Sequence, residues 1–286
     1  MTRQLIVNAD DFGRTRGVSL GIIRAHLDGI VTSTTAMMNM PGVTHDLHQA
    51  HDEAPRLGLG VHLNFTAGRP LMPPDWVKSL IDEHGHFLSQ EAIMADPTCL
   101  DRDELKAELK SQITTFKNAL GHLPDHLDAH HFVHVHPHLF GVYLDLAAEF
   151  DLPIRIPFPR SNIARGSMAA GEAPQLIDNV PPMVVESIVR TDNEMLASQS
   201  FRTTDRCILD FYGKQVTIDD LLNLLDTLPD GVSELMTHPG LADDQLKAES
   251  SYSLQREQEL AALTHPQTLA RVQKLGIELI TFAALG

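Results

Sequence analysis

Cysteine is nearly absent from this sequence, because the 286 residues contain only Cys99 and Cys207. The two are isolated, and neither belongs to a Cys-x-x-Cys pair. A disulfide framework and a thiolate metal site are therefore not indicated.

Long hydrophobic runs are also missing. The apolar stretches have the length of a β-strand, whereas a membrane-spanning helix needs about 20 such residues. The start of the chain, Met1 to Gln4, is polar and is not followed by the apolar core of a signal peptide. We therefore expect a soluble, cytoplasmic protein with no membrane partner.

Positive charge is scarce. The chain has 22 Lys and Arg against 38 Asp and Glu, which gives a formal net charge of −16. Such a surface repels nucleic-acid phosphates and anionic lipid unless a local basic patch intervenes, and no such patch is visible. We therefore expect no nucleic-acid partner. The hydrophobic content of 43% is enough for one large domain or two small ones.

Short apolar, β-branched runs alternate with longer segments of helical periodicity, which is typical of βα units and a parallel sheet. Strands are predicted at 4–9, 32–38, 57–63, 125–129, 153–156, 207–211, 233–236 and 277–282. Helices are predicted at 16–30, 101–120, 137–150, 218–228 and 253–275. Seven or eight such units favour an α/β fold of the barrel type, complete or distorted.

Two stretches fit this alternation poorly, at 67–97 and at 160–202. Both are too long to be simple connections in a compact domain. Neither is charged or rich enough in glycine and serine to be a domain linker. We therefore expect one domain over 1–286, with these stretches as insertions that serve as lids or bind substrate.

Two adjacent carboxylates, Asp10 and Asp11, follow the first predicted strand in the run Asn-Ala-Asp-Asp-Phe-Gly at 8–13. Adjacent carboxylates repel each other unless a cation or a shared proton relieves them. An aspartate before a helix also serves as an N-cap. Capping accounts for one aspartate but hardly for two, so a functional site is favoured here.

Histidine is abundant, with 16 residues, and it is concentrated near strand ends. His62 ends an apolar run, where a lone histidine is more often part of the core. The segment 122–138 then holds seven histidines, among which His130 and His134 follow a strand and precede a helix. Carboxylates and imidazoles without thiolate suit Zn²⁺, Mn²⁺, Co²⁺ or Fe²⁺, and Mg²⁺ where water and carboxylate dominate.

Arg155 lies in an otherwise apolar strand, and burying its charge without a partner is costly. We expect it to pair with Asp10 or Asp11, either as a structural ion pair or as part of a site. His238 follows another apolar strand and precedes a Pro-Gly turn. That position suits a proton donor, with core packing as the alternative.

Four motifs together resemble the YdjC-like carbohydrate deacetylase family, which includes the ChbG-type chitooligosaccharide deacetylases. They are the run at 8–13, Gly-Val-His-Leu-Asn at 60–64, Asp-Ala-His-His-Phe-Val-His at 128–134 and Met-Thr-His-Pro-Gly at 236–240. They occur in the family's order over nearly the whole chain. The resemblance implies a distorted (β/α) barrel related to the NodB-type deacetylases, and a homodimer.

The resemblance also implies roles for residues. Asp11, His62 and His130 would bind one divalent metal ion, Mg²⁺ or Zn²⁺, with His134 as the alternative third ligand. Asp10 would be the general base, tethered by Arg155, and His238 would be the acid.

The implied reaction is hydrolysis of an N-acetyl group on an N-acetylglucosamine-containing oligosaccharide, with release of acetate. Aromatic residues are few, at 5% of the chain, and we expect Trp76 and His134 to contact the sugar. The alternatives are a metal-dependent phosphoesterase or other amidohydrolase, and a sugar-binding protein without turnover.

Overall fold

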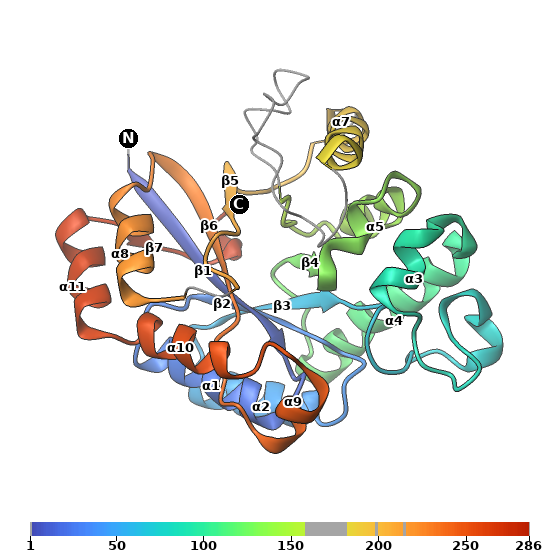
Figure 1. The fold of residues 1–286 in the computed structure, drawn as a ribbon, viewed down its shortest axis with the longest axis horizontal. Coiled ribbons are helices and arrows are strands. Elements are labelled where there is room, and N and C mark those ends of the chain that lie inside the picture. Colours follow the sequence, from blue (N-terminus) through green and yellow to red (C-terminus); the bar gives the residue numbers. More distant parts are fainter. Residues whose placement is uncertain (1, 158–181, 198–199, 214–215, 286) are drawn as a thin grey trace.

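A curled parallel sheet forms the centre of the protein (Figure 1). The computed structural model describes residues 2–157, 182–197, 200–213 and 216–285. The strands run in the order β4-β3-β2-β1-β6-β5, and β7 pairs with β1. Their bounds are β1 Arg3–Phe12, β2 Ser33–Ala36, β3 Gly58–Leu63, β4 Leu127–Ala129, β5 Arg206–Ile208, β6 Gly231–Thr237 and β7 Glu278–Leu279.

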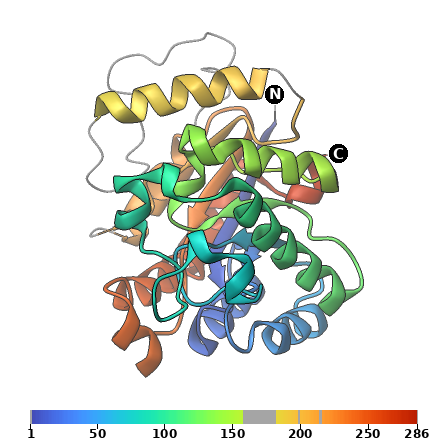
Figure 2. The same cartoon turned by 90° about the vertical axis from the view of Figure 1, so that its right-hand side faces the viewer.

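The helices lie around the outside of this sheet (Figure 1). The N-terminal ones are α1 Arg16–Leu27, α2 Val43–Glu53, α3 Gln90–Ala95, α4 Arg102–Leu120 and α5 Pro137–Phe150. The later ones are α7 Pro182–Ala197, α8 Ile218–Asp226, α9 Asp244–Glu249, α10 Leu254–Leu263 and α11 Pro266–Leu275. Figure 2 shows α7 running alongside α5, against which it packs. None of the described helices combines the length and apolar composition needed to cross a bilayer.

The central strand β1 is covered on both faces. Leu5, Ile6 and Val7 are all buried, and each is apolar. A continuous apolar run of this kind is typical of a parallel strand between helices and barrel interior. The alternation of such runs with helices confirms the α/β fold of the distorted barrel type.

The predicted strand at 153–156 is wrong, because only Ile154 forms a bridge, to Leu127 of β4. Ile154 also donates its backbone N–H to Arg202 at 2.9 Å, while Arg155 donates to Leu127 at 2.9 Å. Pro153 has no N–H to continue a ladder. An irregular segment therefore lies beside β4 where a further barrel strand was expected.

The predicted helix at 253–275 is two helices, α10 and α11. His265 has an extended backbone with φ −69° and ψ 136°, and Pro266 begins α11. A proline disfavours helical geometry in the residue before it, which explains the break. The sequence interpretation also missed α2, whose buried Val43, Leu47 and Ala50 recur at helical spacing.

The first expected insertion, 67–97, contains two short 3-10 helices, η1 (Pro74–Trp76) and η2 (Lys78–Leu80), followed by α3. Its buried side chains include Leu80, Phe87 and Ile93. Of the second, 160–202, residues 160–181 and 198–199 lie outside the described part of the chain. Within it the structure shows α7, which the sequence interpretation did not predict.

Candidate active site

The end of β1 presents two neighbouring carboxylates to one cavity. In a regular strand, Asp10 and Asp11 would point to opposite faces. The β1–β2 register shifts between Ala9 and Phe12, and Asp11 has a φ of 70°. This irregularity brings both side chains to the cavity, where each is 2% exposed.

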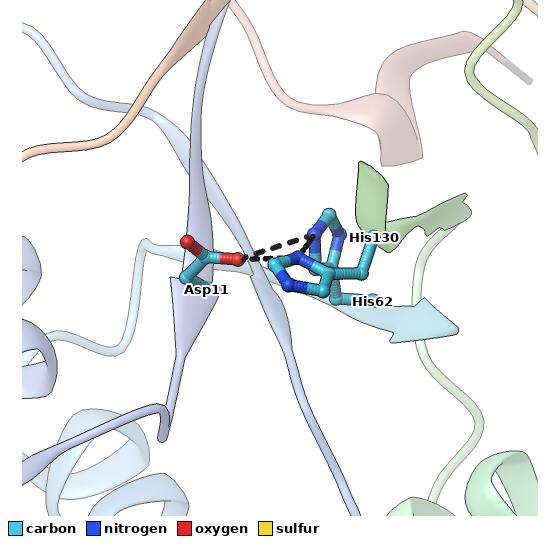
Figure 3. Close-up of side chains that lie close together, drawn as sticks. All are labelled: Asp11, His62 and His130. Carbon is cyan, nitrogen blue, oxygen red and sulfur yellow. Dashed lines mark hydrogen bonds and ion pairs between the residues drawn. The ribbon is translucent and has the colours of Figure 1, made fainter. Parts of the chain in front are cut away.

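Asp11 meets two imidazoles, His62 of β3 and His130, which directly follows β4 (Figure 3). Its Oδ1 lies 3.4 Å from His62 Nε2 and 3.0 Å from His130 Nδ1, and the two ring nitrogens lie 3.3 Å apart. Although it is buried, Asp11 Oδ1 has no hydrogen-bond partner among the described residues. Three donor atoms thus face one point from residues distant in the sequence.

The donor set fits a metal ion. Tetrahedral zinc with ligands at about 2.0–2.1 Å places ligand atoms about 3.3 Å apart, close to the separations of these three atoms. Burial lowers the pKa of His130 to about 4, although the negative charge of Asp11 acts to raise it. Its ring is therefore neutral near pH 7, as a metal ligand must be.

Asp128 orients His62 through the ring nitrogen that is not directed at Asp11. Its Oδ1 lies 2.6 Å from His62 Nδ1, and its Oδ2 accepts from Thr35 Oγ1 at 2.9 Å. A carboxylate on the second ring nitrogen is the usual support of a metal-binding histidine. Burial opposes a charge on His62, but Asp128, Asp11 and Asp10 raise its pKa to about 10. These carboxylates thus favour a positive charge at His62, carried either by a proton or, in its place, by a metal ion at Nε2.

A second group of potential ligands, formed by Asp10, His62 and Asp128, fits a cation less well. Arg155 Nη1 lies 2.6 Å from Asp10 Oδ2 and 2.8 Å from Asp128 Oδ2. The positive charge of Arg155 therefore already balances the negative charge of these two carboxylates. The group of Asp11, His62 and His130 is the better candidate for a metal site.

Arg155 holds Asp10 with two hydrogen bonds, from Nη1 to Oδ2 at 2.6 Å and from Nη2 to Oδ1 at 2.7 Å. Its Nε donates to Glu234 Oε1 at 2.6 Å. Asn8 Nδ2 also donates to Asp10 Oδ1, at 2.9 Å. These hydrogen bonds fix the orientation of the Asp10 side chain. The expected pairing of Arg155 with one of the two aspartates is confirmed.

His238 also lies near Asp10, with its Nε2 3.9 Å from Asp10 Oδ2. Burial lowers the pKa of His238 to about 4, although Asp10 and Asp11 pull it upward. The ring is therefore neutral near pH 7 and is able to accept a proton. Glu259 accepts the backbone N–H of His238 at 2.5 Å and holds this residue in place.

These groups line a cavity of about 260 Å³ at the carboxyl ends of the strands. Five of the residues predicted from the sequence lie along it: Asp10, Asp11, His62, His130 and His238. Arg155 is 1% exposed and lies behind Asp10. Strand ends are where the reactive groups of βα barrels gather.

Two residues expected to contact substrate are not among the cavity's lining residues. His134 is 3% exposed and packs against Tyr143, with ring centroids 4.6 Å apart. The turn before it contains two positive φ values, at His131 and Phe132, so the chain changes direction between His130 and His134. Trp76 is 67% exposed on η1.

The sequence interpretation missed Arg256, which donates from Nη2 to Asp11 Oδ2 at 2.5 Å. Burial would raise the pKa of Asp11, but Arg256 and His130 hold it well below its ordinary value. It also missed Arg14, whose Nη1 lies 3.4 Å from His130 Nε2. Arg256 and Glu259 belong to α10, and a helix pattern alone does not show which side chains reach a distant strand end.

Comparison with known proteins gives full-length matches. A family model described as YdjC-like protein matches residues 4–274. A carbohydrate deacetylase from Geobacillus stearothermophilus is 37% identical over 284 residues, covering 99% of this chain and 98% of that protein. A chitooligosaccharide deacetylase from Proteus mirabilis is 33% identical over 289 residues, covering 100% of both.

A solved structure matches as well. The crystal structure of an Enterococcus faecalis protein, named as a candidate for cellobiose-phosphate cleavage, covers 100% of both chains. It has a TM-score of 0.83 and 32% sequence identity.

Proposed function

This chain belongs to the YdjC-like family, and on that basis we propose that it is a metal-dependent carbohydrate deacetylase. It hydrolyses the N-acetyl group of an N-acetylglucosamine-containing oligosaccharide and releases acetate. The observation that carries the proposal is the convergence of Asp11, His62 and His130 beside an Asp10 that is held by Arg155. Full-length relatives named for carbohydrate and chitooligosaccharide deacetylation support it.

Asp11, His62 and His130 would hold the metal ion, either Mg²⁺ or Zn²⁺. Bound there, a divalent cation lowers the pKa of water and polarises the acetyl carbonyl. Nitrogen-rich ligation favours Zn²⁺ over Mg²⁺ on chemical grounds.

Asp10 is the proposed general base. It would take a proton from the attacking water, and Arg155 holds its side chain in place through two hydrogen bonds.

His238 is the proposed acid. Because its Nε2 lies 3.9 Å from Asp10 Oδ2, it is placed to receive the proton that Asp10 has taken. His238 then passes this proton to the departing amine, so that one proton moves from water to the sugar nitrogen. The neutral ring of the resting protein suits this relay, because it begins as an acceptor.

We extend the proposal to the organisation of the chain as one deacetylase domain over 1–286. Gln90, at the start of α3 in the first insertion, lines the cavity. This supports a role for 67–97 in binding substrate. The resemblance described above is the support for a homodimer.

The test is acetate release from chitooligosaccharides of increasing length, with and without a 6-phosphate. The protein is first treated with a chelator, and individual metals are then added back. We expect acetate release that disappears on chelation and returns with one or more divalent metals. A metal-loaded protein that binds these sugars but releases no acetate is a sugar-binding protein, and that result would reject the proposal.

A further inference from the structure

Two tyrosines from separate segments form a stacked pair beside the cavity. Tyr212 follows β5, and Tyr252 precedes α10. Their ring centroids lie 4.4 Å apart with 22° between the planes. Both residues line the cavity, and Tyr212 is nevertheless 47% exposed. A large aromatic ring at the edge of a cavity offers an apolar face to whatever enters.

The pair is held in place by the surrounding structure. Tyr252 Oη donates to Glu259 Oε1 at 2.6 Å and accepts the backbone N–H of Gly213 at 3.2 Å. Gly213 directly follows Tyr212 and has a φ of 100°, which a residue with a side chain rarely adopts. The chain around Tyr212 is thus tied to Tyr252, and a binding surface fixed in this way loses little entropy when a ligand arrives.

The position of the pair relates it to the reaction. The ring of His238 lies 5.1 Å from that of Tyr212 and 6.0 Å from that of Tyr252. Glu259 binds both the backbone of His238 and the hydroxyl of Tyr252. The proposed acid must lie next to the nitrogen that leaves with the sugar. The sugar ring bearing the acetamido group therefore lies on the tyrosine side, and its acetyl carbon on the side of Asp11.

The size of the cavity also indicates that most of an oligosaccharide lies outside it. At about 260 Å³ it is smaller than most ligand pockets, which measure about 300–1,000 Å³. It has room for an acetamido group and part of one sugar ring, so the rest of an oligosaccharide lies across the opening.

We propose that Tyr212, supported by Tyr252, is the platform on which the sugar ring bearing the scissile acetamido group stacks. The C–H groups of a pyranose face are apolar and weakly positive, which complements the negative face of an aromatic ring. The inference rests on the proposed function, since it takes the ligand to be an N-acetylated sugar. On this proposal, Tyr212 contributes the same binding free energy to the bound substrate and to the transition state.

The test compares Tyr212→Ala and Tyr212→Phe with the wild-type protein, using diacetylchitobiose as the probe. Leu254→Ala is the matched control, because Leu254 is 59% exposed and is not among the residues that line the cavity. Acetate release gives kcat and KM, and calorimetry gives the dissociation constant on the same samples. Thermal unfolding shows that each variant is folded.

We expect Tyr212→Ala to raise KM and the dissociation constant about threefold to tenfold with kcat nearly unchanged. Tyr212→Phe keeps the ring and should bind like the wild type, as should Leu254→Ala. Wild-type affinity in Tyr212→Ala, or a weakening as large in Tyr212→Phe as in Tyr212→Ala, would overturn the platform. A fall in kcat at constant KM would also overturn it and would assign Tyr212 to positioning His238.

The two proposals fail in different ways. If the metal-loaded wild type binds diacetylchitobiose without releasing acetate, the deacetylase proposal is rejected, and calorimetry on Tyr212→Ala still tests the platform. If acetate is released and Tyr212→Ala is indistinguishable from the wild type, only the platform is rejected. An absence of both binding and release in the wild type would reject both.

Discussion

Arg155 and Asp10 are joined by two parallel hydrogen bonds of 2.6 and 2.7 Å, in a place where Arg155 is 1% exposed. The same guanidinium bonds Glu234 and lies 2.8 Å from Asp128. One buried cation thus serves three carboxylates, and its loss affects stability as well as catalysis.

Arg155→Met is expected to lower the free energy of unfolding by about 3–5 kcal/mol, because it leaves buried carboxylates without their partner. Acetate release should also fall, since Asp10 loses both guanidinium bonds. Urea unfolding and acetate release measure the two effects. The matched control is Arg271→Met, which removes a partly exposed ion pair with Asp226 and should cost about 1 kcal/mol or less. Similar losses in the two variants would contradict this account of Arg155.

Asp10→Asn is expected to reduce acetate release at least about 100-fold, because an amide cannot take a proton from water. Its metal content should match that of the wild type, since the proposed ligands are Asp11, His62 and His130. Elemental analysis beside the activity assay checks both points. Unchanged turnover would remove Asp10 from the mechanism, and loss of the metal would make it a ligand.

Asp128→Asn is expected to weaken metal binding about 10- to 100-fold, because His62 loses the charged acceptor that orients its ring. Competition with a chromogenic chelator measures the affinity. The chain offers a close control in Asp125→Asn, since Asp125 makes a similar 2.6 Å contact with His126, and neither residue is among those lining the cavity. Equal weakening in both variants would show that the effect is not specific to His62.

His134 is expected to make the protein less stable in acid. Burial lowers its pKa from 6.5 to about 3, and neither ring nitrogen has a hydrogen-bond partner among the described residues. The unfolded chain takes up a proton that the folded protein does not. The free energy of unfolding therefore falls as the pH drops below 6.5, by at most about 1.4 kcal/mol per unit from this group.

His134→Leu removes this group and should make the pH dependence of stability shallower. Urea unfolding at about pH 7 and about pH 5 measures the difference between the two proteins. Parallel pH dependences in the variant and the wild type would show that His134 is not responsible.

The strand ends could be predicted from the sequence because parallel strands are continuous apolar runs whose last residues share one edge. That rule locates Asp10, Asp11, His62, His130 and His238 without any knowledge of the fold's details. It does not give the backbone irregularity at Asp11, which turns two neighbouring carboxylates toward one cavity.

The rest of the site depends on tertiary packing. Arg256 and Glu259 lie on a helix with ordinary amphipathic spacing, and only the docking of α10 brings them to Asp11 and His238. Tyr212 and Tyr252 are 40 positions apart, one in the segment after β5 and the other between α9 and α10, and they meet only in the folded protein. The segment 153–156 has the composition of a strand, yet Pro153 limits it to one bridge.

Arg155 comes from that irregular segment, after β4, and it reaches carboxylates on β1, β4 and β6. Side chains from three strands therefore share one guanidinium. The irregular segment beside β4 thus supplies the residue that holds the proposed base. The folded protein thus holds the Asp10 carboxylate in one orientation before any substrate arrives.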